Sequence, residues 1–296
     1  MPLAARYASW LGPPTEPVGD VPDEDPAAVR AMPLILRIER NAVPSRTALL
    51  EAAASAAVAL CLDERSRPGG PWHPEVAPWV GRRIRKVSRR ARGAHWVAVT
   101  DLPGVTVERA GAEVRALLPW LVADTPRAVT RLQVGGTDVP SDDPGPPPEG
   151  YPVLWLPPEP VMTVGKAAAQ VGHATMLLAA LLAVQGPLAA LDFWAADGYR
   201  CAVRTASPKK WTALAAGERP DLAWRQRGVL AVRDAGFTEV PPGTVTVAAH
   251  WPPSAAPCLP RHGDISVPEG CLSPRYVSMS GEGWAGWAGS GGDETG

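Results

Sequence analysis

The chain has 296 residues, a formal net charge of −1 and 46% hydrophobic residues. This length allows one large or two small domains with a buried core, and the balanced charge excludes a strongly polyanion-binding surface over the whole molecule. Cys258, His262 and Cys271 do not have zinc-ligand spacing, so we expect no metal and no other cofactor.

The N-terminus carries no basic-then-apolar signal, and the longest apolar stretch, Met176 to Val184, is half the length of a membrane span. We therefore expect a cytoplasmic protein with no membrane partner. Gly and Pro, at 29 and 35 residues, together exceed a fifth of the chain, and this bias is typical of a GC-rich bacterial genome.

Proline, glycine and acidic residues divide the chain into five segments. Residues 1–31 resemble an extended acidic leader, 141–150 a stiff Pro-rich linker, and 253–296 a C-terminal extension that ends in a disordered tail. Two compact segments remain, residues 32–140 and 151–252.

Each compact segment contains the same predicted order of elements. In the first, we expect a strand, a helix, a strand, a helix and a strand at Leu34–Ile38, Ser45–Leu62, His95–Thr100, Glu108–Leu118 and Ala128–Val134. In the second, the corresponding ranges are Val153–Leu156, Thr163–Val184, Tyr199–Arg204, Pro208–Ala216 and Gly228–Arg233. The alternation predicts an α/β protein of two similar α/β/α units, and the repeated order suggests a diverged internal duplication.

The long, Ala-rich helix predicted at Thr163–Val184 carries a narrow polar stripe. Thr163 is a natural N-cap, which puts Lys166 in the first turn, and Lys166, Gln170 and His173 follow at spacing i, i+4, i+7. A cation in the first turn opposes the helix dipole, so an anion should compensate it. The stripe fits either the wall of a pocket or the solvated edge of an amphipathic helix.

A second polar feature follows the last strand of that segment. Asp234 ends an apolar run and is followed by Gly236 and by a Thr-Val pattern of period two. A carboxylate at a strand end is a common place for a positioned base, and it is equally an ordinary turn residue.

Taken together, the two features resemble a known family. Gly165-Lys166-x-Ala168-Ala169-Gln170-x-x-His173-Ala174, followed by Asp234-Ala235-Gly236-x-Thr238 and Pro-Gly-Thr-x-Thr246-Val247, is similar to the signature of peptidyl-tRNA hydrolases of the archaeal and eukaryotic type. The resemblance covers about a third of the chain. It implies an α/β fold with a mixed sheet flanked by helices, assembly as a homodimer, and hydrolysis of the ester between a peptide and tRNA.

The resemblance assigns roles residue by residue. It implies catalytic roles for Lys166, Gln170, Asp234 and Thr238, and substrate contacts for His173 and Thr246. The sequence departs from the family pattern in two places. Glu239 replaces a Gln that commonly follows the motif Thr, and Leu156-Pro157-Pro158-Glu159 replaces an Arg-Thr-Asp-Leu run.

The first segment lacks these residues. Aligning Pro33 with Pro152 puts Thr47, Glu51 and Ala54 at the positions of Lys166, Gln170 and His173, and Val134 or Gly135 at that of Asp234. The first half is then either a degenerate copy that occupies the place of the family's second subunit, or an unrelated α/β domain. If it is a degenerate copy, we expect the protein to be a monomeric pseudo-dimer or a homodimer.

The first half also contains a dense basic cluster beside Trp79 and Trp96. Its members are Arg82, Arg83, Arg85, Lys86, Arg89, Arg90 and Arg92. Such a cluster can bind phosphates while indoles stack on unpaired bases, and it can also be a solvated helix face. With tRNA implied as substrate, we interpret the residues from Arg82 to Arg90 as RNA contacts.

The expected mechanism is direct attack by water, because no Ser or Cys lies in a nucleophile motif. Asp234 would orient or deprotonate the water, Thr238 and Gln170 would hold it, and Lys166 would stabilise the oxyanion or the terminal phosphate. The alternatives are a non-catalytic tRNA-binding protein that kept the scaffold, or a hydrolase or binder of another small ester or carbonyl ligand.

Overall fold

The computed structural model describes residues 25–135, 139–185, 188–214, 220–236 and 238–251. The predicted leader up to residue 24 and the predicted tail from residue 252 lie outside the described residues. The last residues of the proposed leader are structured, because strand β1 already begins at Arg30.

The first half contains a mixed sheet in the order β2-β1-β4-β3, with the short strand β5 paired to β1. Strands β1 and β2 are parallel, and the pairs β1/β4 and β3/β4 are antiparallel. The strands are β1 (Arg30–Arg37), β2 (Lys86–Ala91), β3 (Gly104–Arg109), β4 (Ala112–Leu117) and β5 (Trp120–Leu121). The helices are α2 (Arg46–Leu62), α3 (His73–Val80), α4 (Gly93–Thr100) and α5 (Arg127–Thr130), with 3₁₀ turns at Pro26–Ala28, Glu64–Ser66 and Val122–Asp124.

The second half contains a mixed sheet in the order β7-β6-β9-β8. Strands β6 and β7 are parallel, and the pairs β6/β9 and β8/β9 are antiparallel. The strands are β6 (Val153–Leu156), β7 (Ala202–Thr205), β8 (Val229–Arg233) and β9 (Val245–His250). The helices are α6 (Val164–Gln185), α7 (Leu188–Ala196), α8 (Pro208–Leu214) and α9 (Pro220–Arg227).

The protein therefore consists of two α/β units with mixed sheets flanked by helices, as predicted. Strand for strand, β2-β1-β4-β3 and β7-β6-β9-β8 have the same order and the same pattern of parallel and antiparallel pairs. This equivalence agrees with the duplication hypothesis, which remains an interpretation because a common topology does not by itself establish a common origin.

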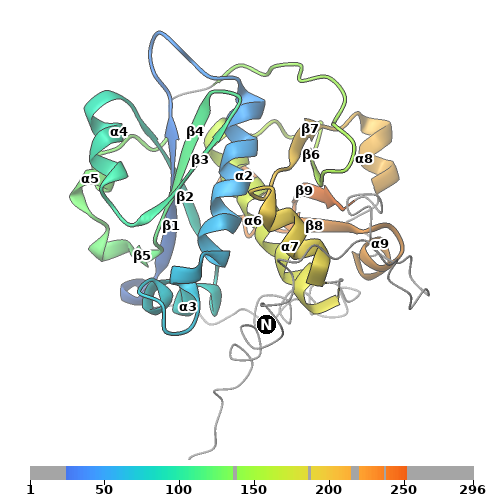
Figure 1. The fold of residues 1–296 in the computed structure, drawn as a ribbon. Coiled ribbons are helices and arrows are strands. Elements are labelled where there is room, and N and C mark those ends of the chain that lie inside the picture. Colours follow the sequence, from blue (N-terminus) through green and yellow to red (C-terminus); the bar gives the residue numbers. More distant parts are fainter. Residues whose placement is uncertain (1–24, 136–138, 186–187, 215–219, 237, 252–296) are drawn as a thin grey trace, which may run out of the picture.

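Helices α2 and α6 pack against each other between the two sheets (Figure 1). One hydrophobic core runs through both halves and includes Leu49 and Ala53 of α2 and Val171 and Leu178 of α6. Helix α6 is apolar and long enough to cross a membrane, but 83% of its most apolar part is buried inside the protein. Its hydrophobicity is explained by this central position.

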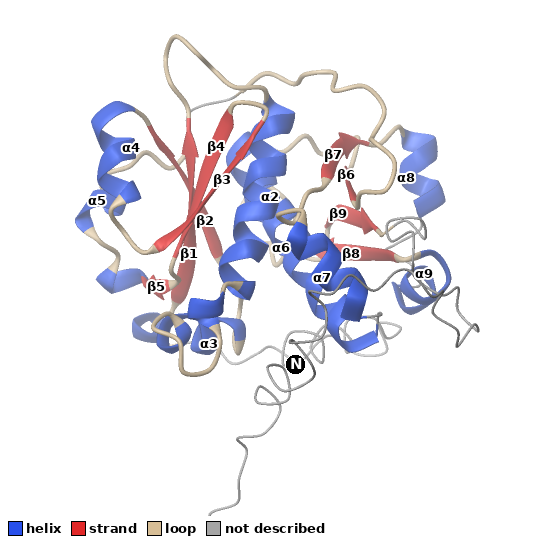
Figure 2. Cartoon of the chain, in the orientation of Figure 1, coloured by secondary structure: helices blue, strands red, loops and turns tan. Residues whose placement is uncertain are grey.

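The outer faces of the sheets are covered by short helices. Helices α4 and α5 cover the first sheet and α8 and α9 the second (Figure 2). On the first sheet, Trp96 and Val99 of α4 pack on Ile35 and Leu117. On the second, Leu214 and Ala223 pack on Ala231 and Ala248.

Each element predicted in the second half is found there, whereas three predictions fail in the first half. In the second half, the strand predicted from Tyr199 begins at Ala202, residues 215 and 216 of the predicted helix lie outside the described residues, and helices α7 and α9 were not predicted. His95–Thr100 is helix α4 and not a strand, because Trp96 and Val99, three residues apart, both face the core. Ala128–Val134 is not a strand either, since it contains the end of helix α5. The second strand of this sheet is instead β2, whose charged sequence KVSRRA hid its β-structure.

The third failure is the helix predicted over Glu108–Leu118, which is the β3–β4 hairpin. Arg109 pairs with Ala112, and both residues between them have positive φ, 45° at Ala110 and 80° at Gly111. Two successive positive φ values form the two-residue turn that matches the twist of a hairpin. By strand order this turn, and not Val134 or Gly135, corresponds to the loop after Asp234.

The segment 141–150 is held against both halves. Asp142 accepts hydrogen bonds from the backbone N–H and the hydroxyl of Thr47, at 3.0 and 2.9 Å. The carbonyl of Gly145 accepts a 2.8 Å bond from Nε of Arg204. This predicted linker thus contacts the start of α2 and strand β7, on opposite sides of the boundary between the halves.

Candidate active site

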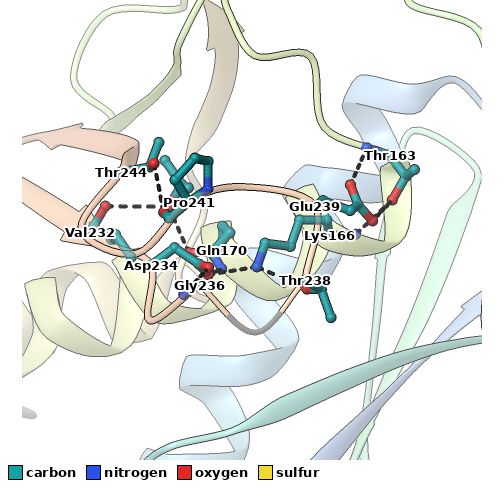
Figure 3. A network of polar contacts seen from close by, with 11 residues as sticks. Thr163, Lys166, Gln170, Val232, Asp234, Gly236, Thr238, Glu239, Pro241 and Thr244 are labelled. Carbon is teal, nitrogen blue, oxygen red and sulfur yellow. Dashed lines mark hydrogen bonds and ion pairs between the residues drawn. The ribbon is translucent and has the colours of Figure 1, made fainter. Parts of the chain in front are cut away.

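The candidate site lies where the start of helix α6 meets the loop between β8 and β9. Thr163 precedes the helix, and its hydroxyl accepts a 3.2 Å hydrogen bond from the backbone N–H of Lys166. This is the N-cap predicted from the sequence. It places Lys166 in the first helical turn with its side chain directed at the loop (Figure 3).

Lys166 and Asp234, to which the expected mechanism gives roles at one ester, are in direct contact. Nζ of Lys166 lies 2.6 Å from Oδ1 of Asp234, and only 9% and 8% of these two side chains are exposed. Nζ also donates to the hydroxyl of Thr238 at 3.1 Å. An ammonium group has three N–H donors, so one is left for a substrate atom.

The Asp234 carboxylate is held by three N–H donors. Oδ1 accepts from Lys166 and, at 2.8 Å, from Nε2 of Gln170. Oδ2 accepts from the backbone N–H of Gly236 at 2.8 Å. The backbone N–H of Asp234 bonds Thr244, and its carbonyl accepts from Gly243, which closes the loop behind it. The carboxylate is thus fixed in orientation, with lone-pair capacity left on Oδ2.

Gln170 and Thr246 form a buried support for this carboxylate. Gln170 is 3% exposed, and its Oε1 accepts a 2.7 Å hydrogen bond from the hydroxyl of Thr246. Thr246 is fully buried at 0% exposure, so its expected contact with substrate is wrong. Strand β9 has one extra residue opposite the Val232–Arg233 step, and this irregularity includes Thr246. Bulges commonly re-aim a side chain in this way.

Glu239, which departs from the family pattern, connects the loop to the helix start. Its Oε1 accepts from the hydroxyl of Thr163 at 2.7 Å and its Oε2 from the Thr163 backbone N–H at 3.0 Å. A carboxylate accepts on both oxygens, which a Gln cannot do, and its charge is favourable at a helix N-terminus. The sequence identified Glu239 only as a departure, whereas the structure shows it joining the two halves of the motif.

His173 lies two turns along α6 and faces the first half of the chain. Its Nδ1 is 3.1 Å from Nζ of Lys86 on strand β2. Burial, followed by the charges of Lys86 and Lys166, lowers the pKa of His173 well below 6.5. The imidazole is therefore neutral at physiological pH. The sequence did not predict this contact, because nothing in the residue pattern pairs β2 with α6.

The basic cluster is divided between two faces of strand β2. Lys86 and Ser88 face α6, where the Ser88 hydroxyl donates to the Gly165 carbonyl at 2.7 Å. Arg89 faces the opposite side and donates to the carbonyls of Thr130 and Leu132. Arg90 alternates with Arg89 and so belongs to the Lys86 face. The cluster is therefore not one continuous phosphate-binding surface, and Lys86 and Arg89, which were predicted to contact RNA, are held by contacts within the protein.

The predicted stacking of bases on indoles is also wrong. Trp79 is 0% exposed and Trp96 is 5% exposed. Trp79 donates from its indole nitrogen to the carbonyl of Arg85, and Lys86 lies over its ring. Both tryptophans are core residues of the first half.

The first half has no counterpart of the Lys166–Asp234 site at the positions compared. Eleven residues, 234 to 244, separate β8 from β9, whereas only Ala110 and Gly111 separate β3 from β4. On helix α2, Glu51 accepts from Nη1 of Arg204 and from the backbone N–H of Val203, both at 3.0 Å. Glu51 thus binds strand β7 of the other half, as His173 binds strand β2.

Comparison with known proteins agrees with this division of the chain. Residues 159–258 match the family model of peptidyl-tRNA hydrolase PTH2. No curated protein and no solved structure matches the chain. The match spans 100 of 296 residues and includes the predicted residues of the site, from Lys166 on α6 to Thr246 on β9.

The PTH2 match supports a hydrolase acting on peptidyl-tRNA at the level of the family. It begins after strand β6 and leaves the first half unassigned, so the degenerate copy stays a hypothesis. No group of three or more His, Cys, Asp or Glu residues suited to a metal ion occurs among the described residues. At the candidate site, the PTH2-like half brings together an ammonium, a carboxylate and a hydroxyl group.

Proposed function

We propose that this protein hydrolyses the ester that joins a peptide, or an N-blocked amino acid, to the 3′ end of tRNA. The observation that carries the proposal is the contact between Lys166 and Asp234, a nearly buried ion pair with 2.6 Å between Nζ and Oδ1. The same Nζ also donates a hydrogen bond to the exposed Thr238. The family match to peptidyl-tRNA hydrolase PTH2 supports the choice of substrate.

In the proposed reaction, water attacks the ester carbonyl without a covalent enzyme intermediate. Thr238 is exposed, and its hydroxyl accepts from Lys166, so its own O–H is available to a water molecule. The free capacity on Oδ2 of Asp234 accepts a proton from that water as it attacks. The proton then passes to the departing ribose oxygen of the tRNA.

Lys166 has the electrophilic role in this scheme. Two of its N–H groups hold Asp234 and Thr238, and the third donates to the carbonyl oxygen, which becomes an oxyanion in the transition state. Gln170 holds Asp234 and not the water, because its amide is buried between Asp234 and Thr246.

We propose that tRNA phosphates contact the arginines that precede β2 and the face of β2 next to α6. The residues are Arg82, Arg83, Arg85 and Arg90. Such contacts make affinity fall steeply with salt, because bound phosphates release their counterions. Since its substrate is a product of translation, the enzyme would act in the cytoplasm.

Single-turnover hydrolysis of N-acetylaminoacyl-tRNA tests the proposal. We expect Lys166→Ala and Asp234→Ala each to lower the rate by at least about 100-fold, the usual contribution of an oxyanion donor or a general base. Lys209→Ala and Asp192→Ala, at exposed positions, are the matched controls. Near-normal rates in both site variants would contradict the proposal.

The same samples separate this function from its alternative. A wild-type protein that binds tRNA tightly and releases no peptide would be a tRNA-binding protein on a hydrolase scaffold. Equal hydrolysis of a simple N-acetylamino acid ester would show that the tRNA is not recognised.

A further inference from the structure

Lys86 is a half-buried lysine that has no role in the reaction proposed above. Its side chain leaves edge strand β2 of the first half and reaches helix α6 of the second. A Cβ added to Gly172 would lie 3.2 Å from Cε of Lys86. The absence of a side chain at Gly172 therefore makes room for the contact between Lys86 and α6.

The surroundings of Lys86 contain a base and no carboxylate partner. Nζ faces Nδ1 of His173 on α6 at 3.1 Å and the ring of Trp79 on α3 at 5.1 Å from its centre, and Cys61 at the end of α2 is the nearby titratable group. In the part of the chain that the structure describes, Lys86 forms no ion pair.

Because Lys86 forms no ion pair among the described residues, its charged form is disfavoured in this position. Burial lowers the pKa of Lys86 to about 7, because the charged form loses its hydration. A methionine of similar length would fill the same space without that cost. A residue that is costly to the fold and contacts the helix of the site is a candidate for function.

We propose that Lys86 is a positioning residue supplied by the first half, which holds His173 of the catalytic helix as the neutral imidazole that carries its proton on Nε2. When Lys86 is an ammonium it only donates, so Nδ1 of His173 must then accept and the ring proton lies on Nε2. The nearby charge of Lys86 also opposes a second proton on the ring.

The consequence for the site rests on the function proposed above. His173 lies seven residues after Lys166, about 10 Å along the helix axis, and is only partly buried. The atom left for substrate is the Nε2–H, an uncharged donor. It suits a neutral acceptor of the substrate that lies about this far from the ester, such as a peptide carbonyl, more than it suits a phosphate.

The ring state of His173 is measured directly by long-range ¹H–¹⁵N correlation spectra over a pH titration. His173→Gln identifies the signals. In the wild type we expect a neutral ring in the Nε2–H tautomer at pH values where Lys86 is charged. In Lys86→Met we expect a mixture of tautomers at the same pH values and a higher apparent pKa of His173. Lys209→Met, on the surface, is the control.

Hydrolysis provides the second readout. We expect Lys86→Met to lower kcat/KM for N-acetylaminoacyl-tRNA by about 10-fold or more, as loss of a positioned donor does. If Lys86 acts through His173, the double variant Lys86→Met/His173→Gln is no slower than His173→Gln alone.

Each possible result of these experiments either supports or overturns the role proposed for Lys86. An unchanged tautomer and titration of His173 in Lys86→Met overturn the proposal whatever the activity. A changed ring with unchanged hydrolysis, or additive losses in the double variant, overturns the contribution of Lys86 to the site. If the wild type does not hydrolyse the ester at all, the function proposed above fails, and the spectra alone still test the control of His173 by Lys86.

Discussion

The polar residues of α6 form two separate contacts, although they lie on one stripe. Lys166 and Gln170 turn toward the β8–β9 loop and share Oδ1 of Asp234. His173 turns toward β2 and contacts Lys86. At the scale of single residues, the chemistry is therefore divided between a loop of the second half and a strand of the first.

The acidity of Lys86 predicts a pH-dependent stability. Its pKa is about 7 in the folded protein and near the ordinary 10.5 when unfolded. Between these values the unfolded chain binds more protons, so the free energy of unfolding of the wild type rises with pH across this window. His173, whose pKa is lowered, acts in the same direction below pH 6.5.

Replacing Lys86 removes the cost of burying its charge, which is fully present below pH 7. We expect Lys86→Met to raise the free energy of unfolding at pH 6 by roughly 1–3 kcal/mol, less than full burial would give because the residue is partly exposed. The gain shrinks as pH approaches 10. Urea unfolding at pH 6, 7.5 and 9 measures it, and a gain that is constant over this range would contradict the assigned pKa.

At the scale of elements, the packing of α2 on α6 decides where the site can form. A Cβ added at Gly172 would lie 3.0 Å from Cβ of Ala57, which is closer than ordinary packing allows. At Gly165 in the same helix, the nearest atom would be Cβ of Ser88 at an ordinary 3.6 Å. The two glycines are therefore a matched pair in one helix with different surroundings.

These surroundings predict opposite effects of substitution. Gly165→Ala should leave the free energy of unfolding unchanged or raise it by up to about 1 kcal/mol, from helix propensity. Gly172→Leu should lower it by about 1–3 kcal/mol, because helix α2 must move away. Thermal and urea unfolding provide the comparison. Tolerance of leucine at residue 172 would show that the helices are not closely packed there.

At the scale of the whole molecule, the two halves share one core and cannot be separated without exposing it. Val171, Ala174 and Leu178 of α6 belong to the same buried cluster as Leu49 and Ala53 of α2. A Glu51–Arg204 ion pair and the contacts of residues 141–150 also cross the boundary. The free second half would carry an apolar helix face, and such a face favours association.

This arrangement predicts different solution masses for the whole chain and for its second half. We expect the 31.1 kDa chain to be a monomer, because α2 already covers α6. We expect residues 149–296 alone to self-associate through α6. Light scattering after size-exclusion chromatography measures both. A dimeric full chain with a monomeric, folded second half would contradict the pseudo-dimer.

The sequence alone predicted most of the second half of this protein and its Lys166–Asp234 pair. A capped, Ala-rich helix and a strand ending in Asp-Ala-Gly are local patterns, and each formed where its residues predicted, with Lys166 meeting Asp234. Predictions from local patterns failed where the secondary structure of a segment depends on its contacts with other segments. The charged run Lys86–Ala91 is a strand because it pairs with β1. Trp96 and Val99 both face the core because the segment is a helix, which its sequence alone did not indicate.

Only the tertiary structure decided which side chains support the site. Thr246 lies inside and not at the substrate, Glu239 binds the start of α6, and Lys86 crosses from one half to the other. These contacts join residues that are 76 or more positions apart, and their spacing carries no periodic signal. They depend on how two sheets pack around two helices, which is a property of the whole core.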